Sequence, residues 1–244
     1  MSGIERYTYI TINKMKISII IPAYNEAEYI HKLVNHLTRF GSDSLQDIII
    51  SDGGSTDDTL KIARASGAMA IVSPEKGRAA QMNYGASLAK GELLYFIHAD
   101  TLPPDKYIDD LLQAINEGND MGRYLSKYNS KSWLLKINAL LSRLDTFAGM
   151  GGDQTLYIKK SLFEQAGGFD SSMKIMEEFE FCARARKQGK YKIINKPVLI
   201  SARKYDNNGW FTVQKVNYTV VRMYQKGASQ ESMVLKYKEM LNYR

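Results

Sequence analysis

The chain has 244 residues, of which 44% are hydrophobic and 24% charged, a balance that fits a globular protein and excludes wholesale disorder. Its net charge of +7 indicates an anionic partner, such as nucleotide phosphate, nucleic acid or an acidic membrane face, or else a solvated basic surface. The single cysteine excludes an internal disulfide framework, and no signal-peptide pattern or apolar run of about 20 residues is present, so we expect a cytoplasmic protein.

The first half of the chain alternates between apolar strands and helical stripes. We expect strands at residues 16–22, 47–51, 68–73 and 93–98. We expect four helices. The first carries the apolar stripe Ile30, Leu33, Val34 and Leu37, the second runs from a cap at Ser55 to Gly67, and the other two span 79–89 and 106–117. Fully apolar strands that alternate with helices predict an α/β fold, with a Rossmann-like, mostly parallel sheet covered by helices on both faces.

The second half is less regular. Residues 120–150 are basic and helical in pattern, and residues 149–158 run from glycines into a strand. Further expected elements are a short helix within 162–170, a helix at 176–188, a strand at 191–200 and a helix on Val213, Val216, Val220 and Met223. We interpret the chain as one domain, 1–244, with a first half at 16–117, a second at 118–205 and a helical tail at 206–244.

Two basic amphipathic segments, 131–144 and 213–226, leave two interpretations open. Such stripes more often face a core, and this is the interpretation that we adopt. The alternative is contact with the inner surface of a membrane, which would make the protein a membrane-surface adaptor.

Three of the expected strands end on polar or turn residues. These ends are Ala23-Tyr24-Asn25-Glu26, Asp52-Gly53-Gly54-Ser55 and His98-Ala99-Asp100. Parallel sheets bind ligands beyond the carboxyl ends of their strands, so the three segments should converge on one binding rim.

The pair His98 and Asp100 has the spacing of two ligands at a strand end. A carboxylate suits Mg²⁺, whereas Mn²⁺ also accepts an imidazole, so this pair predicts a site for a divalent cation and the diphosphate that it bridges. The alternative is a plain turn in which Asp100 caps the next segment.

The segment from Asp52 to Asp57 allows close approach of a ligand to the backbone, because paired glycines follow an acid at a strand end. Haloacid-dehalogenase phosphatases need an aspartate where Gly54 stands, and actin-like sugar kinases open with a hairpin that is not predicted here. The chain has no G-x-G-x-x-G and no Walker lysine motif. Cys182 fits a packed helix residue better than a nucleophile, and the dispersed aromatic residues do not form a platform for nucleic acid.

The rim segments are more specific together than singly. ISIIIPAYNEAEYI, SDGGSTDDT and KGRAAQMNYGASLAKGELLYFIHAD closely resemble the nucleotide-sugar-binding half of family 2 glycosyltransferases, which have the A-type fold. The likeness continues through GGDQTLYIKKSLFEQAGGFD and IMEEFEFCARARKQGK and covers roughly residues 16–205. Within the family, the chain is most similar to the bacterial subgroup in which a histidine begins the Asp-x-Asp motif.

The resemblance implies that the chain binds a nucleoside-diphosphate sugar. It implies that Asp100 holds Mn²⁺ or Mg²⁺ and that His98 replaces the usual first acid. Three interpretations of His98 stay open: contact with the metal, contact with the ribose, or neither. The second acid of the usual pair after Asp52 is missing, because Gly53 stands there. The residues assigned to donor binding are Pro22, Ala23, Tyr24, Glu26, Asp52, Gly53, Arg78, Asn83, His98, Ala99, Asp100 and Arg203.

The resemblance also implies an inverting transfer to an acceptor hydroxyl. Glu178 takes the place of the family's general base, and Glu177 and Asp153 are assigned to the catalytic site beside it. The alternative for Glu178 is an ordinary acidic first turn of a helix, which the helix dipole favours. The acceptor half has no diagnostic motif, so a lipid, a glycan or a small molecule all fit. A nucleotide-sugar-binding protein without transfer activity is the remaining alternative.

Overall fold

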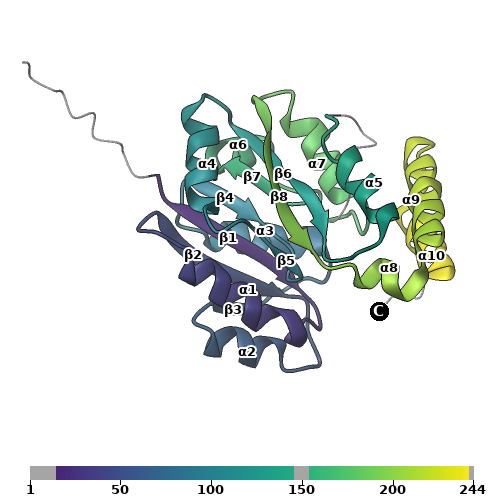
Figure 1. Cartoon of the computed structure of the whole chain (residues 1–244), viewed down its shortest axis with the longest axis horizontal. Coiled ribbons are helices and arrows are strands. Elements are labelled where there is room, and N and C mark those ends of the chain that lie inside the picture. Colours follow the sequence, from purple (N-terminus) through teal and green to yellow (C-terminus); the bar gives the residue numbers. More distant parts are fainter. Residues whose placement is uncertain (1–14, 146–153, 242–244) are drawn as a thin grey trace, which may run out of the picture.

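The structure, a computed structural model, describes residues 15–145 and 154–241. Its strands are β1 (Ile17–Ala23), β2 (Leu45–Asp52), β3 (Met69–Val72), β4 (Leu93–Phe96), β5 (Thr101–Leu102), β6 (Met121–Tyr128), β7 (Leu156–Lys159) and β8 (Tyr191–Ile200). They form one sheet in the order β3-β2-β1-β4-β7-β6-β8-β5, with helices on both faces (Figure 1). The α/β fold with a mostly parallel sheet is confirmed.

The helices follow the strands in regular alternation through the first half of the chain. They are α1 (Ala27–Arg39), α2 (Thr59–Ala65), α3 (Arg78–Leu88), α4 (Tyr107–Asn116), α5 (Trp133–Leu141), α6 (Lys160–Gln165), α7 (Glu177–Ala185), α8 (Arg203–Asn208), α9 (Trp210–Gln225) and α10 (Gln230–Met240). The four strands and four helices that the sequence predicts in the first half are all present, with ends shifted by a few residues.

Two hydrophobic cores lie on opposite faces of the sheet, because successive side chains of a strand point to opposite sides. On β1, Ile19 and Ile21 face the core that α1 and α4 cover, whereas Ile20 faces the core that α3, α6 and α7 cover. All seven residues of β1 are buried, which explains why the strand has no polar alternation.

The expectation of a helical pattern over 120–150 is wrong for its first part. Residues 121–128 form β6, which pairs with β7 on one side and with β8 on the other. Its first six residues are buried, so the strand lacks the alternation that would have marked it. A side chain on Gly122 would collide with the carbonyl oxygen of Lys192, so glycine here allows a close approach of β8.

The expected helix cap at Ser55 is also wrong. The helix α2 begins at Thr59, with Asp58 as its N-cap residue. The Ser55 hydroxyl instead donates to the Asp52 carboxylate and accepts from the Asn25 amide at 2.8 Å. Ser55 therefore ties the loops after β1 and β2 together.

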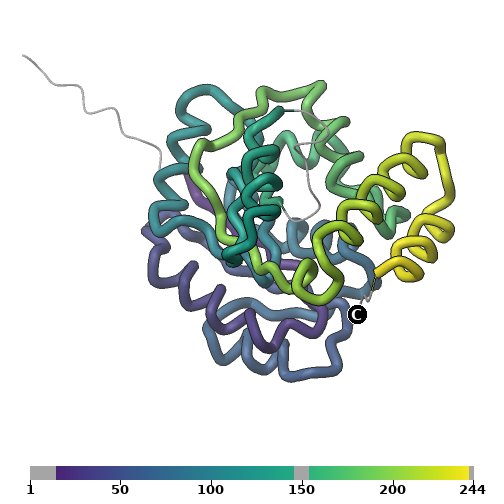
Figure 2. The backbone as a smooth tube through the Cα atoms, turned by 45° about the vertical axis from the view of Figure 1, so that its right-hand side comes forward, coloured from purple at the N-terminus to yellow at the C-terminus, as the bar shows by residue number. Residues whose placement is uncertain are grey.

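The C-terminal helices form a third core, separate from the sheet. Leu135 of α5 packs there with Val213, Val216 and Val220 of α9 and Met233 of α10. Figure 2 shows α9 and α10 at one side of the molecule. The sequence analysis expects the amphipathic segments 131–144 and 213–226 to face a core. This is right for 213–226, which lies in α9, and wrong for 131–144, because α5 buries only Leu135. The division into parts at 117 and 205 remains a prediction.

In the part of the chain that the structure describes, no helix has the length and apolar character needed to cross a membrane.

Candidate active site

The loops after β1, β2 and β4 meet at one edge of the sheet. Ala23 at the end of β1 lies beside Asp52 at the end of β2, and β4 runs parallel to β1 on its other side. Asn25 turns the chain out of β1 with a positive φ of 54°. Its side-chain oxygen accepts a hydrogen bond from the Thr56 amide at 2.8 Å, so the two loops support each other. The predicted convergence of the three strand ends therefore occurs.

Asp52 is fully buried and organises the turn that follows it. Its Oδ2 accepts from the amides of Gly54 at 2.9 Å and Ser55 at 2.8 Å, and its Oδ1 accepts from the Ser55 hydroxyl. The carboxylate is thus satisfied within its own loop, an arrangement typical of Asx turns. Any contact between Asp52 and a nucleoside would have to share these oxygens.

Gly53 leaves room for a residue that the sequence did not single out. A Cβ at Gly53 would lie 2.6 Å from Nε2 of Gln81. This nitrogen donates to the carbonyl oxygens of Ala23 at 2.7 Å and Ser51 at 3.1 Å. The buried Gln81 amide therefore joins the ends of β1 and β2 beside the position where the family pattern has its second acid.

Arg203 joins two carboxylates from distant parts of the chain. Its guanidinium donates to Glu26 at 2.7 and 2.5 Å, and its Nε lies 3.0 Å from Oδ2 of Asp100. Burial lowers the pKa of Arg203, but the hydrogen bond to Glu26 and the charge of Asp100 outweigh it, so the net shift is upward. Arg203 also lies over the ring of Tyr29, 4.7 Å from its centroid. It is thereby held at the rim as a permanent positive charge.

A second charged group forms where α7 meets α3. Met176, with a positive φ of 68°, is the N-cap residue of α7, so Glu177 and Glu178 lie in the first turn of this helix. Arg78, the first residue of α3, has Nη1 at 3.4 Å from Glu177 and 3.8 Å from Glu178. Glu178 also lies 3.4 Å from Nε2 of His98. Glu178 therefore contacts the predicted donor motif directly.

Two groups of this cluster have raised pKa values. Burial is the largest single influence on the pKa of His98, and it lowers this pKa. The charge of Glu178 and its hydrogen bond to His98 together raise the pKa by more, so the net shift is upward. Burial raises the pKa of Glu177, and the charge of Arg78 offsets this only in part. Clustered shifts of this kind are typical of functional sites, although structural ion pairs produce them too.

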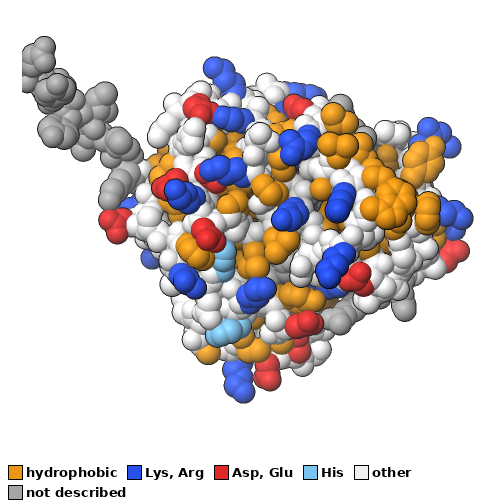
Figure 3. All heavy atoms as spheres, viewed as in Figure 1, with side chains coloured by type: hydrophobic (Ala, Val, Ile, Leu, Met, Phe, Trp, Pro, Cys, Tyr) orange, Lys and Arg blue, Asp and Glu red, His pale blue; other side chains and the backbone are white. Residues whose placement is uncertain are grey.

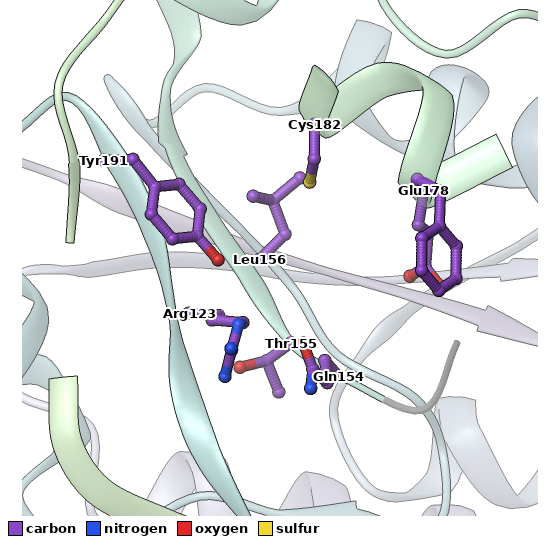
Figure 4. Close-up of a pocket in the computed structure, with 8 residues that line it drawn as sticks. Arg123, Gln154, Thr155, Leu156, Glu178, Cys182 and Tyr191 are labelled. Atoms are coloured by element: carbon purple, nitrogen blue, oxygen red, sulfur yellow. The ribbon is translucent and has the colours of Figure 1, made fainter. Parts of the chain in front are cut away.

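Glu178 also lines a cavity beside β6, β7 and β8 (Figure 4). The figure shows Arg123 from β6, Leu156 from β7 and Tyr191 from β8 around the same space. The remaining lining residues are Gln154, Thr155, Phe179 and Cys182. Burial raises the pKa of Cys182 to about 12, so this thiol is poorly suited to nucleophilic chemistry.

The other predicted donor residues differ in their exposure. Pro22, Ala23 and Ala99 are buried, whereas the ring of Tyr24 is half exposed at the rim. The Asn83 amide bonds with the backbone of Phe169 at 2.8 and 2.9 Å and with the Ser171 hydroxyl, so it holds a turn after α6. These contacts do not favour its predicted role in donor binding.

Asp153 lies outside the described residues. Sequence reasoning missed four further candidate site residues, because their relevance depends on contacts with distant segments: Gln81, Arg123, Thr155 and Tyr191.

The described residues contain no group of three or more His, Cys, Asp or Glu side chains that could enclose a metal ion. A single carboxylate such as Asp100 still fits a cation that takes most of its ligands from water and a bound diphosphate. The ring nitrogen Nε2 of His98 faces Glu178, so the structure does not present His98 and Asp100 as a ready pair of ligands.

The sequence matches the family described as Glycosyl transferase family 2 over residues 18–176. The chain therefore belongs to this family. A binding protein of this family without transfer activity remains the alternative to a transferase. The subgroup with the His-Ala-Asp motif remains a prediction.

Curated relatives agree with this family assignment. The chain is 32% identical over 107 residues to glycosyltransferase GlyG of Streptococcus pneumoniae, covering 41% of this chain and 35% of that protein. It is 28% identical over 127 residues to a dolichol-phosphate mannosyltransferase of Pyrococcus furiosus, covering 49% and 36%. The chain thus spans a third to a half of the length of such relatives.

Solved structures confirm the A-type fold. Residues 1–349 of Staphylococcus aureus TarS, in complex with UDP-GlcNAc, match with a TM-score of 0.62 at 20% identity, over 77% of this chain and 58% of that one. Mycobacterium tuberculosis glucosyl-3-phosphoglycerate synthase, in complex with Mn²⁺, UDP-glucose and phosphoglyceric acid, matches with a TM-score of 0.53 at 18% identity, over 75% and 71%. At these identities the likeness concerns the fold.

Proposed function

We propose that the chain transfers a sugar from a nucleoside-diphosphate sugar to an acceptor hydroxyl, with inversion at the anomeric carbon and Glu178 as general base. One observation carries the proposal. The Glu178 carboxylate contacts His98 of the donor motif at 3.4 Å and also lines the cavity on the other side. A base that serves this reaction needs that intermediate position, because it removes the acceptor proton next to the donor's anomeric carbon.

The donor would bind across the rim formed by the ends of β1, β2 and β4. The half-exposed ring of Tyr24 is suited to stacking on a nucleobase, with the buried backbone of Pro22 and Ala23 as the floor. Arg203 and Arg78 supply positive charge at two points of the rim. Such fixed cations stabilise the negative charge that grows on the leaving nucleoside diphosphate.

Mn²⁺ or Mg²⁺ would be held by Asp100. When bound, the cation would neutralise charge on the diphosphate as the sugar leaves. The complexes of glucosyl-3-phosphoglycerate synthase with Mn²⁺ or Mg²⁺ and UDP or UDP-glucose support this assignment. Arg203, which lies 3.0 Å from Asp100, would orient this carboxylate.

Glu178 is better placed than Glu177 to act as the base. The Glu177 side chain is 5% exposed and lies against Arg78, whereas the Glu178 side chain is 15% exposed and borders the cavity. In the proposed step, the acceptor oxygen forms a bond to the anomeric carbon while the bond to the diphosphate oxygen breaks. The hydroxyl proton passes to Glu178, and the nucleoside diphosphate leaves with the bonding electron pair. No covalent sugar–enzyme intermediate is required.

The acceptor is proposed only as a hydroxyl compound, which fits a lipid, a glycan or a small molecule. Related proteins include transferases named for dolichol phosphate and undecaprenyl phosphate, and the solved synthase holds phosphoglyceric acid. A nucleotide-sugar donor and a single cysteine fit a cytoplasmic site of action.

The test is the substitution Glu178→Gln, which preserves size but removes the ability to accept a proton. General-base catalysis typically contributes about 10²–10⁴-fold, so transfer should fall by a factor in that range while donor affinity measured by calorimetry stays unchanged. A set of nucleotide sugars supplies the donor, and released nucleoside diphosphate gives the rate.

Glu177→Gln and Glu164→Gln serve as matched comparisons for this test. Glu164 is exposed on α6, so its substitution should leave transfer unchanged. Near-normal turnover of Glu178→Gln, combined with a large loss in Glu177→Gln, would reassign the base to Glu177.

A further inference from the structure

The net positive charge of the chain arises from two stretches. Residues 121–144 and 207–230 contain no Asp or Glu. They carry eight basic residues: Arg123, Lys127, Lys131, Lys136, Arg143, Lys215, Arg222 and Lys226. The rest of the chain has 25 Lys and Arg against 26 Asp and Glu, a net charge of −1, so these stretches account for the whole net charge of +7. Such segregation indicates a dedicated anionic partner rather than a generally basic surface.

The two stretches lie side by side in the structure, because they supply α5 and α9. Asn138 of α5 accepts hydrogen bonds from Nε1 of Trp210 at 3.2 Å and from Nε2 of Gln214 at 3.0 Å. Leu135 of α5 and Val213 of α9 share one core. The two helices are therefore packed against each other, and Lys136 of α5 and Lys215 of α9 are both exposed.

The outward side of α5 is apolar. Trp133, Ile137 and Leu140 follow one another at the spacing of a single helix face, opposite the buried Leu135, and the exposed Leu144 follows just after the helix ends. Trp133 is 67% exposed and Leu140 63%. Adjacent large apolar side chains exposed in this way are typical of interaction sites.

The outward side of α9 alternates between aromatic and basic residues. Phe211, Lys215, Tyr218 and Arg222 again share one helix face, and Phe211 is 74% exposed. No carboxylate among the described residues pairs with Lys131, Lys136 or Lys215. Figure 3 shows hydrophobic and basic side chains intermixed over the region of α5 and α9, with few acidic ones.

We propose that the outward sides of α5 and α9, here called the α5–α9 face, bind the surface of a membrane that contains anionic lipids. Exposed Trp, Leu and Phe side chains insert at the boundary between headgroups and acyl chains, and Lys and Arg beside them attract anionic headgroups. A second copy of this chain is a poor occupant, because a symmetric contact would place two acid-free basic surfaces against each other.

The α5–α9 face would hold the active site close to the membrane. Arg123 lines the cavity next to Glu178 and donates hydrogen bonds to the carbonyl oxygens of Ser142 at 2.8 Å and Leu144 at 3.2 Å. The C-terminal end of α5 is thus linked to the cavity through one side chain. Membrane binding does not depend on the proposed transfer reaction, so the two can be tested separately.

The experiment is sedimentation of the full chain with vesicles of phosphatidylcholine and phosphatidylglycerol in equal amounts. We expect binding to these vesicles, weaker binding in 0.5 M NaCl (about a 4 Å Debye length by the usual scaling), and little binding to pure phosphatidylcholine. Trp133 should also report the contact. In the variant Trp210→Phe, the tryptophan fluorescence should shift to shorter wavelength when vesicles are added. In the variant Trp133→Phe, most of that shift should be absent.

Two double substitutions test the apolar and basic contributions separately. Each Lys or Arg near an anionic surface strengthens binding about fivefold, so Lys131→Glu/Lys136→Glu should weaken it by at least about 25-fold. Trp133→Glu/Leu140→Glu should reduce binding at least about tenfold even in low salt. The matched controls are Met69→Glu on β3, an edge strand of the sheet, and Lys61→Glu on α2. Both positions are exposed and lie outside the α5–α9 face, so these variants should bind like the wild type.

Three outcomes would overturn the proposal. The first is a wild-type protein that does not sediment with anionic vesicles, or controls that lose binding as much as the variants. The second is a dimer in sedimentation velocity that Trp133→Glu/Leu140→Glu converts to a monomer. The third is binding to duplex DNA at the same affinity as to vesicles, with no effect of the apolar substitutions. Thermal melts of every variant confirm that the altered surface belongs to folded protein.

Discussion

At the scale of single residues, the site depends on side chains that satisfy backbone groups rather than on the acids alone. Gln81 is an example, because its buried amide joins the carbonyl oxygens at the ends of β1 and β2. Gly53 has no side chain where the family pattern expects an acid, and a Cβ there would meet this amide at 2.6 Å. The two residues are therefore physically coupled.

The coupling can be measured with Gly53→Ala. Overpacking typically costs about 1–3 kcal/mol, so we expect a loss of unfolding free energy in that range from urea denaturation. In the background Gln81→Ala, the same substitution should be nearly neutral, since the clashing amide is gone. An equal loss in both backgrounds would show that the clash is not with Gln81.

Glu177 predicts a specific dependence of stability on pH. Its pKa is raised above the ordinary 4.5 in the folded protein, chiefly by burial. Between 4.5 and the folded pKa, the native state binds more protons than the unfolded state, so the contribution of Glu177 falls as pH rises through this window. Glu177→Gln does not titrate. The stability of this variant relative to wild type should therefore increase from pH 4.5 upward and then level off at higher pH.

Urea denaturation between about pH 4 and 8 checks this sign. Glu164→Gln, at an exposed position of α6, is the control and should show a difference from wild type that changes little with pH. A relative stability of Glu177→Gln that falls with rising pH would contradict the prediction.

At the scale of elements, packing between segments decided what the pattern left ambiguous. β6 was expected as part of a helix, yet it lies between β7 and β8 with both faces buried, which removes the alternation that identifies strands. α5 has apolar residues at helical spacing, but only one of its residues, Leu135, is buried in the third core. Its position is set by polar bonds as well as by apolar packing.

Asn138 makes those polar bonds. It donates to the Tyr205 hydroxyl at 2.9 Å and accepts from Trp210 and Gln214, which connects α5 with α8 and α9. Asn138→Ala leaves these partners without their bonds and should lower the unfolding free energy by about 1–3 kcal/mol. Hydrogen exchange should accelerate mainly in α8, α9 and α10. Asn116→Ala, exposed at the end of α4, is the control, and acceleration confined to the sheet would contradict the prediction.

At the scale of the whole molecule, the proposed donor site joins parts of the chain that lie far apart. Glu26 follows β1, Asp100 follows β4, and Arg203 in α8 contacts both. A ligand that binds this rim selects the folded state and raises the unfolding temperature. The basic stretches lie elsewhere, on α5 and α9, so the net charge of the chain is not explained by the donor diphosphate.

Thermal denaturation with UDP and other nucleoside diphosphates tests the donor site and its metal. At a ligand concentration about 100 times the Kd, stabilisation is about 2.7 kcal/mol, which is several degrees for a chain of this size. We expect Mn²⁺ to increase this stabilisation in the wild type but not in Asp100→Ala, each compared with its own melting temperature without ligand. Asp109→Ala, exposed on α4, should behave like the wild type. An undiminished effect of Mn²⁺ in Asp100→Ala would remove this residue as the metal ligand.

The amino-acid sequence by itself determined the α/β class, the strands and helices of the first half, and the three strand ends that meet at the rim. These features depend on local patterns, namely apolar runs ended by turn residues, and on the general geometry of parallel sheets. Tertiary structure alone decided the contact between His98 and Glu178, the pairing of Gln81 with Gly53, the strand β6, and the exposure of the stripe on α5. Each of these depends on segments that are distant in the chain, because only packing determines which partner a side chain meets and which face of a helix remains uncovered.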